Sequence, residues 1–202
     1  MPPTPPADCH TAGKLPTPPA DCPHRRQTAI QLSAAIINFC QDLNERLPPC
    51  PGLPDCALPP ACVSNLRLQA MLYVIQLRSL QLHGHAGRIL DEDFEAWSMG
   101  PVLGSVYQTY RHYGAERIYD RQRGDPALPD AHAYLGSLIE KTALAMPFAL
   151  IRLTRGHGGA WHQTRSRHER IITPELMARE AASLPNLSTM HYASLFAALT
   201  CR

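Results

Sequence analysis

Apolar residues recur at helical spacing in several blocks of this chain, with short breaks between the blocks. In residues 27–47 they recur among polar ones at near-helical spacing, and two consecutive prolines then end the pattern. A second block, residues 65–82, is apolar on most of its sides, which is typical of a helix at the centre of a core. Ser64 is a suitable N-cap for that helix, and Gly84 can end it because glycine adopts positive φ at low cost.

The second half of the chain continues the helical pattern in shorter pieces. We expect helices at 132–144, 148–155, 174–183 and 188–199, with Thr173 as the N-cap of the third. Between residues 88 and 97 the pattern is weaker and fits a turn, a short extended segment or one helical turn. The sequence therefore predicts an all-α fold, mainly a single helical domain, with room for one small β-hairpin near 88–97.

The stretch DFEAWSMGPVLGSVY, residues 93–107, places a tryptophan three residues before a Gly-Pro pair. Proline is favoured at the first position of a helix, because the N–H that it lacks would have no intrahelical partner there. We therefore predict that a helix starts at Pro101 and ends near Gly114. The ring of Trp97 is expected to anchor the turn before this helix, and direct contact with a partner is the second interpretation.

An acidic stretch, residues 91–95, precedes this turn. Paired catalytic carboxylates or metal ligands would need a second, spaced cluster, which is not evident here. A solvated face, or a charged interaction surface, is therefore the better interpretation. Some of these carboxylates could also stabilise the positive end of the helix that follows.

Composition limits what the chain can do. With 202 residues, 45% of them apolar, it can form one domain with extensions around a buried core. The net charge of +2 is a poor match to a dedicated DNA-binding domain, so nucleic acid is not the expected partner. No segment approaches the ~20 apolar residues of a membrane span, and the N-terminus is unlike a signal peptide. We therefore expect a cytoplasmic protein without a membrane segment.

Proline and cysteine are concentrated in two segments. PTPPADC occurs at residues 3–9 and again at 16–22, and we expect residues 1–26 to be a disordered extension. A second such stretch is predicted to be a loop insertion at 48–63, within a helical domain that spans 27–202. Its cysteines are separated by five intervening residues, a poor spacing for a zinc clip, and the seven cysteines of the chain are expected to be free thiols.

No catalytic motif stands out in the sequence. Cys40 lies in an apolar helical pattern with nothing nearby to lower its pKa, and no serine occupies a nucleophile elbow. No phosphate-binding loop occurs. We therefore expect no enzymatic activity, no cofactor and no metal site.

Residues 152–170 are rich in arginine and histidine and contain Trp161. Basic residues beside an aromatic ring can contact nucleic acid. Pairing with the acidic stretch, or with a partner protein, is an equally reasonable interpretation. A nucleic-acid-binding regulator, or a phage-associated adaptor that uses this segment, is therefore the alternative to the function implied below.

The order of motifs in residues 66–114 resembles the Panacea domain. The shared features are a Leu-Gln-x-x-Leu-Tyr helix, a turn with glycine, an acidic stretch, an Ala-Trp-x-x-Gly-Pro-Val turn and a helix with tyrosine. In this chain they are Leu68, Gln69, Leu72 and Tyr73; Gly84 and Gly87; Asp91 to Glu95; Ala96, Trp97, Gly100, Pro101 and Val102; and Tyr107. A weaker similarity through His157, Trp161 and Ile172-Thr173 extends the resemblance to about residues 28–185.

The resemblance implies a bacterial or prophage antitoxin of a toxin–antitoxin system. Such a protein neutralises a cognate protein toxin, encoded by an adjacent gene, by direct protein–protein binding. The resemblance does not name the toxin, and it leaves homo-oligomer formation open. The residues that it marks for the motif or for partner binding are Tyr73, Asp91, Glu95, Trp97, Gly100, Pro101, Val102, Tyr107 and Trp161.

Overall fold

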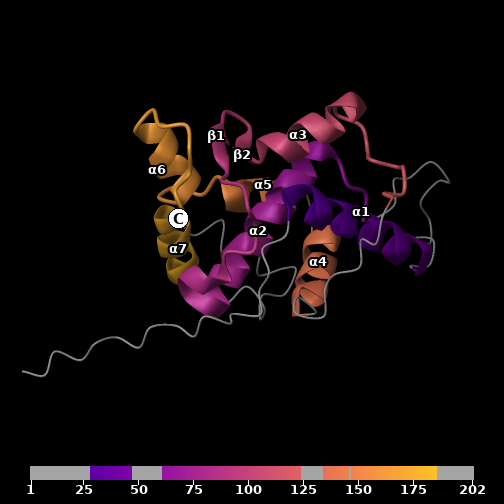
Figure 1. Ribbon diagram of the computed structural model, residues 1–202, viewed down its shortest axis with the longest axis horizontal. Coiled ribbons are helices and arrows are strands. Elements are labelled where there is room, and N and C mark those ends of the chain that lie inside the picture. Colours follow the sequence, from indigo (N-terminus) through magenta and orange to yellow (C-terminus); the bar gives the residue numbers. More distant parts are fainter. Residues whose placement is uncertain (1–27, 47–60, 124–133, 146, 186–202) are drawn as a thin grey trace, which may run out of the picture.

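The computed structural model describes residues 28–46, 61–123, 134–145 and 147–185, which form a mainly helical fold (Figure 1). The helices in chain order are α1 (Ala29–Arg46), α2 (Asn65–His83), α3 (Gly104–Tyr110), α4 (Tyr134–Leu144), α5 (Pro147–Thr154), α6 (Ala160–Ser166) and α7 (Pro174–Ser183). Short 3₁₀ helices, Gly84–Gly87 and Arg111–Tyr113, follow α2 and α3. Strands β1 (Glu95–Trp97) and β2 (Gly100–Val102) form an antiparallel hairpin.

Helix α2 is the centre of the core, as its all-round apolar pattern predicts. Helices α1, α3, α4, α5 and α7 pack against it, whereas α6 lies on α7 and on the hairpin. Side chains from Leu68 to Leu77 are almost completely buried, which matches a helix with neighbours on most sides. None of the described helices combines the length and the apolar character needed to cross a lipid bilayer.

The all-α prediction is confirmed, and the helices expected at 27–47, 65–82, 132–144, 148–155 and 174–183 are present with small shifts at their ends. Ser64 caps α2 by accepting from the N–H of Arg67 at 3.4 Å, and Thr173 caps α7 by accepting from the N–H of Leu176 at 3.3 Å. The predictions for 1–26, for 188–199 and for residues 48–60 of the insertion fall outside the described residues.

The prediction that a helix starts at Pro101 is wrong. The hairpin, at residues 95–102, lies later in the chain than the predicted range of 88–97. Pro101 is in β2, opposite Ala96, and α3 starts only at Gly104. The N–H of Ala96 points away from β2 to the carbonyl oxygen of Arg170, so this is a pair without ladder hydrogen bonds. Proline is tolerated there because no N–H is required, and Gly100 supplies the tight turn with a φ of +132°.

Two buried glutamines of α2 hold the segment that carries the hairpin. Gln76 Oε1 accepts from the N–H groups of Ile89 and Leu90, both at 3.2 Å, just before the hairpin. Gln69 Oε1 accepts from the N–H of Leu103 at 2.8 Å, just after it. Because Gln69 and Gln76 are two helical turns apart, both face the same segment. The hairpin is therefore fixed to the core at both of its ends.

The acidic stretch before the hairpin makes contacts within the chain. Asp91 Oδ1 accepts from the N–H of Ala29 at the start of α1, at 3.1 Å. Glu92 accepts from the N–H of Ser105 at 3.1 Å, in the first turn of α3, which is the interaction with a positive helix end considered above. Asp93 forms an ion pair with Arg88 at 2.9 Å. These three carboxylates therefore stabilise helix starts and the loop.

Candidate interaction surface

The hairpin is extended on its outer side by the segment that follows α6. The N–H of Ala96 donates to the carbonyl oxygen of Arg170 at 2.7 Å. Glu95 and Ile171 face each other as an antiparallel bridge, so their side chains project from the same side of this small sheet. Strand β1 therefore has extended neighbours on both sides.

Trp97 is held at the surface by its neighbours. Its Nε1 donates to Glu95 Oε2 at 2.7 Å, and its ring centroid lies 4.9 Å from that of Tyr107. Glu95 also accepts two hydrogen bonds from the guanidinium of Arg170, at 2.9 and 2.8 Å. The bonds from Arg170, and next that from Trp97, lower the pKa of Glu95, so this carboxylate is charged at neutral pH. The indole is therefore fixed in one orientation while half-buried.

Trp161 joins α6 to the hairpin. Its Nε1 donates to the carbonyl oxygen of Trp97 at 2.9 Å, and the guanidinium of Arg155 lies over its ring at 5.5 Å from the centroid. Arg165 Nη1 donates to the carbonyl oxygen of Ala96 at 3.4 Å. Figure 1 shows α6 beside the hairpin at one end of the molecule. The sequence places Trp161 in a short segment after a glycine-rich break, and that segment is a helix.

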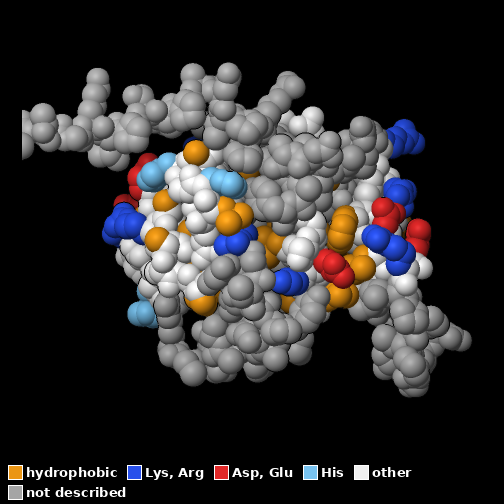
Figure 2. All heavy atoms as spheres, turned by 90° about the horizontal axis from the view of Figure 1, so that it is seen from below, with side chains coloured by type: hydrophobic (Ala, Val, Ile, Leu, Met, Phe, Trp, Pro, Cys, Tyr) orange, Lys and Arg blue, Asp and Glu red, His pale blue; other side chains and the backbone are white. Residues whose placement is uncertain are grey.

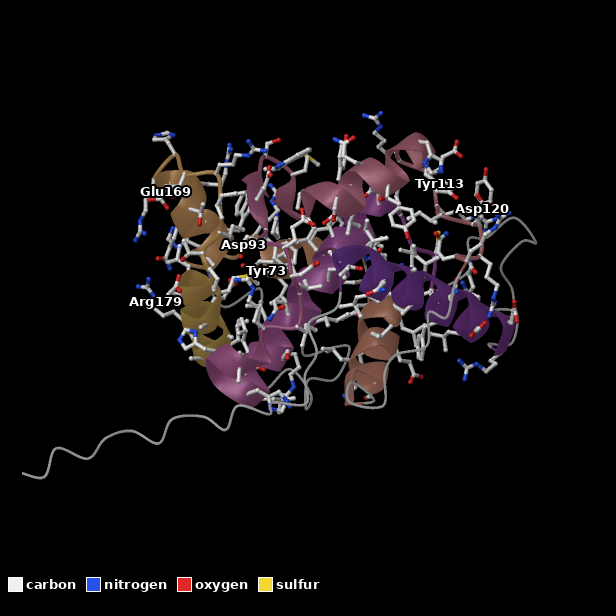
Figure 3. The ribbon with its side chains drawn as sticks, in the orientation of Figure 1. Tyr73, Asp93, Tyr113, Asp120, Glu169 and Arg179 are labelled. Carbon is white, nitrogen blue, oxygen red and sulfur yellow. The ribbon has the colours of Figure 1, made fainter. Side chains whose placement is uncertain are left out.

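A buried polar contact between α2 and α7 lies beneath α6. The hydroxyl of Tyr73, which Figure 3 shows in the interior, donates to Glu180 Oε2 at 2.5 Å. The same oxygen accepts from the N–H of Ala160 at 3.0 Å, at the start of α6. Gly159 leaves room for the carboxylate, because a Cβ there would lie 2.6 Å from Glu180 Oε1. Glu180 therefore holds α6, and with it Trp161, against the core.

The phenol of Tyr73 keeps its proton in this contact. Burial, and next the charge of Glu180, raise the pKa of Tyr73 well above its ordinary value. The hydroxyl therefore remains a donor to the carboxylate at neutral pH. Tyr73 is fully buried, so its role in the motif is to support α6 from below.

Apolar side chains are exposed around these contacts. Met99, in the hairpin turn, is 57% exposed, and Ile171 is 42% exposed. The name hairpin–α6 face is used below for Trp97, Met99, Tyr107, Trp161 and Ile171 with the surrounding Arg155, Arg165, Arg167 and Arg170. Arg170 is paired with Glu95. For Arg155, Arg165 and Arg167 no carboxylate of the described residues lies within ion-pair distance.

The structure brings most of the predicted site residues together. Glu95, Trp97, Gly100, Tyr107 and Trp161 all lie on or beside the hairpin–α6 face. Gly100 lies against the side chain of Arg155, since a Cβ there would be 3.8 Å from the Arg155 Cδ.

The other predicted site residues lie away from this face. Tyr73 is in the core, Pro101 and Val102 are buried in β2, and Asp91 is at the start of α1. They support the elements that carry the face, but they do not form its surface.

Motif analysis did not find several residues that form or support the face. Glu180 looks like an ordinary acid in an amphipathic helix, and its contact with Tyr73 spans 107 residues of sequence. Met99 lies between Ser98 and Gly100, and Ile171 is one of two adjacent isoleucines, so neither stands out in the sequence. Only the arginines carried a signal, because they lie in the basic segment 152–170.

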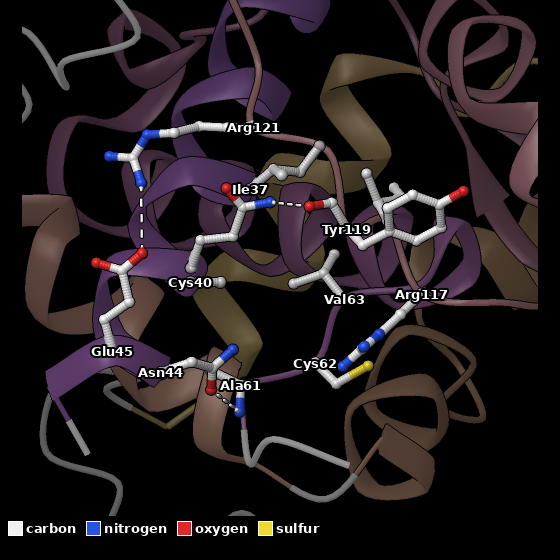
Figure 4. A pocket seen from close by; sticks show the side chains of 12 residues that line it. Ile37, Cys40, Asn44, Glu45, Ala61, Cys62, Val63, Arg117, Tyr119 and Arg121 are labelled. Atoms are coloured by element: carbon white, nitrogen blue, oxygen red, sulfur yellow. Dashed lines mark hydrogen bonds and ion pairs between the residues drawn. The ribbon is translucent and has the colours of Figure 1, made fainter.

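A pocket of about 380 Å³ at the α1 end of the molecule is the second candidate site (Figure 4). Cys40 and Cys62 line it and are free thiols. Burial raises the pKa of Cys40 to about 12 and also raises that of Cys62. Arg121 at the rim forms ion pairs with Asp42 at 2.6 Å and with Glu45 at 3.9 Å. Since a thiolate is the nucleophile, neutral thiols give this pocket no evident chemistry.

Arg121 is paired with acidic side chains at this end, whereas Arg46, Arg117 and Arg123 have no carboxylate of the described residues within ion-pair distance. Figure 2, a view from below, shows acidic and basic side chains intermixed on the right of the molecule, where α1 ends in Figure 1. Among the described residues, no group of three or more His, Cys, Asp or Glu side chains is placed to hold a metal ion.

Comparisons of the chain with protein-family models, with curated proteins and with solved structures gave no match. The features of the chain that bear on its function are therefore its surfaces and the motif in residues 66–114.

Proposed function

We propose that this chain is a cytoplasmic antitoxin that neutralises a cognate protein toxin by binding it through the hairpin–α6 face. The observation that carries the proposal is the composition of that face. Tryptophan, tyrosine and arginine are the residues most often responsible for binding energy in protein interfaces, and methionine is enriched there too. The toxin as partner comes from the resemblance to the Panacea domain, whose motif residues Trp97 and Tyr107 lie on this face.

The face is suited to tight binding because its rings are ordered before a partner arrives. Trp97 is fixed by Glu95 and Tyr107, and Trp161 is fixed by the carbonyl oxygen of Trp97. Side chains that are already ordered lose little conformational entropy on association. Inhibition then requires only that the toxin surface is covered, and no bond is made or broken.

Co-expression with the product of the adjacent gene tests this function. The toxin alone should arrest growth, and the chain should restore it. Replacing Trp97 with Ala together with Met99→Ser should weaken the complex by about a hundredfold and abolish rescue, because the centre of the face is lost. Met99→Ser alone, which removes no internal hydrogen bond, should weaken rescue partly.

The matched control is Tyr119→Ser, an aromatic residue that is 62% exposed and lines the pocket at the other end of the molecule. Its rescue should equal that of the unmodified chain. Growth arrest that persists while soluble, intact chain is present would contradict the proposal.

A further inference from the structure

The basic segment 152–170 is folded around the apolar part of the hairpin–α6 face. Arg155 comes from the end of α5, whereas Arg165 and Arg167 come from the end of α6. All three are exposed. Arg155 is directed onto the Trp161 ring, and Arg165 toward the Ala96 carbonyl oxygen, so two of them are held close to the exposed apolar side chains.

Carboxylates of the described residues do not balance the positive charge of this face. Arg170 is neutralised by Glu95, but the described residues offer no carboxylate within ion-pair distance of Arg155, Arg165 or Arg167. At the α1 end, by contrast, Arg121 lies near both Asp42 and Glu45. An excess of positive charge around an apolar centre favours a partner that carries negative charge around its own apolar contact.

We propose that the hairpin–α6 face binds an acidic polypeptide segment whose carboxylates meet Arg155, Arg165 and Arg167 while an apolar side chain covers Met99. This inference rests on the proposed function, because it names the chemistry of the toxin surface that the antitoxin recognises. Guanidinium groups suit this role, since they bind carboxylates through two parallel hydrogen bonds.

The arrangement of the rings favours a polypeptide over a nucleic acid. Stacking on a base requires a free aromatic face. Trp161 has Arg155 over its ring, and Trp97 has the Tyr107 ring packed against it. Exposed Met99 and Ile171 gain most from an apolar side chain.

Intrinsic fluorescence offers a direct readout, because both tryptophans of the chain lie on this face. The full-length protein is titrated with a short peptide in which Glu alternates with Leu. Parallel titrations use the same peptide with Gln in place of Glu, and a thymidine oligonucleotide of equal net charge. We expect the Glu–Leu peptide to bind at least about tenfold more tightly than either control, and to weaken as salt is added.

Charge reversal locates the contact. The combined variant R155E, R165E and R167E should weaken binding of the Glu–Leu peptide by at least about tenfold, and the R155Q, R165Q and R167Q variant should weaken it less. The matched control, R46E with R117E and R123E, changes three exposed arginines at the α1 end and should leave binding unchanged. Circular dichroism of each variant checks that it is folded.

Each contrary result has a definite meaning. The oligonucleotide could bind as tightly as the peptide, and its binding could be lost in the R155E, R165E and R167E variant. That result would identify the partner as a nucleic acid and would overturn the acidic polypeptide. Absence of peptide binding, or binding that this variant leaves intact, would overturn the inference.

The inference and the proposed function fail separately. Toxin neutralisation that survives the R155E, R165E and R167E variant but is lost with Trp97→Ala and Met99→Ser would keep the antitoxin function and refute the acidic partner. Peptide binding without any rescue from the toxin would refute the antitoxin function instead.

Discussion

At the α1 end, Arg121 lies near two carboxylates and the pocket thiols are neutral, whereas at the hairpin end three exposed arginines surround ordered aromatic rings and exposed methionine. Both ends contain arginine beside tyrosine, so residue type alone does not separate them. Arg121 is paired, but Arg46, Arg117 and Arg123 at the α1 end have no carboxylate of the described residues within ion-pair distance, so the difference lies in the ordered tryptophans and exposed methionine beside the arginines of the hairpin end. Charges satisfied within the chain stabilise the fold, and charges without an internal carboxylate remain available to a partner.

The largest effect is expected for thiol reactivity at the α1 end. The pKa of Cys40 is raised from 9.0 to about 12, so its thiolate fraction near pH 8 falls by about a thousandfold relative to an ordinary cysteine. Iodoacetamide labelling followed by mass spectrometry of each cysteine peptide measures this. Cys40 should remain unlabelled until the protein unfolds, and Cys62 should react slowly. Rapid labelling of Cys40 in the folded protein would show that the pocket is a thiol site after all.

The next effect concerns the support of the hairpin–α6 face. Replacing Glu180 with Ala leaves the Tyr73 hydroxyl and the Ala160 N–H without their buried acceptor. We expect the free energy of unfolding to fall by about 2–4 kcal/mol in urea denaturation. The matched control is Glu169→Ala, an exposed acid on the same side of the fold, which should change it by less than about 0.5 kcal/mol. Equal values for both variants would exclude a supporting role for Glu180.

A smaller loss of stability is expected when buried polar contacts are removed, and it should differ between the two ends of the molecule. Gln76→Ala removes the acceptor of two buried N–H groups, and we expect a loss of about 2–3 kcal/mol in the free energy of unfolding. Asn38→Ala removes bonds to the N–H and C=O of Gln122, which is only half-buried, so water can replace them and about 1 kcal/mol is expected. Thermal denaturation of both variants shows which one is less stable. A larger loss of stability for Asn38→Ala than for Gln76→Ala would contradict this prediction.

The smallest effect is a shift in an acid transition. Because the pKa of Glu95 is lowered in the folded protein, its stabilising contribution is complete above the ordinary value of 4.5 and is lost as the pH falls through the lower, folded value. Arg170→Ala removes the largest cause of that lowering, so Glu95 of the folded protein should take up its proton at a higher pH. Tryptophan emission followed from pH 6 downward, at roughly 0.1 M salt, reports it. Superimposable curves for the variant and the unmodified chain would argue against the Glu95–Arg170 contact.

Local sequence signals predicted the helices but not the face. Ser64, Gly84 and Thr173 act as the caps that their residue types suggest, because capping depends on neighbours a few residues away. The error at Pro101 has a non-local cause. The strand that contains it exists because β1 pairs with it and also with residue 170, which the local preference of proline for a helix start does not report.

The buried charges were equally hidden from sequence analysis. Arg67 lies in α2 at the centre of the core, where it is 5% exposed and donates to the carbonyl oxygen of Ala145 at 2.6 Å, after α4 ends. Glu180 meets its partners only when α2, α6 and α7 have packed together. Periodicity shows which face of a helix is apolar, but it does not show which polar side chain finds a distant backbone group.

The shared carboxylate oxygen beneath α6 has a consequence for motion. Ala160 can release its amide proton to solvent only when Glu180 withdraws, and Glu180 cannot withdraw without also abandoning Tyr73. A short helix of seven residues should therefore open at the slow rate of the interior, and not at the fast rate of a surface turn. A protein that binds the hairpin–α6 face would therefore meet a surface that is already ordered.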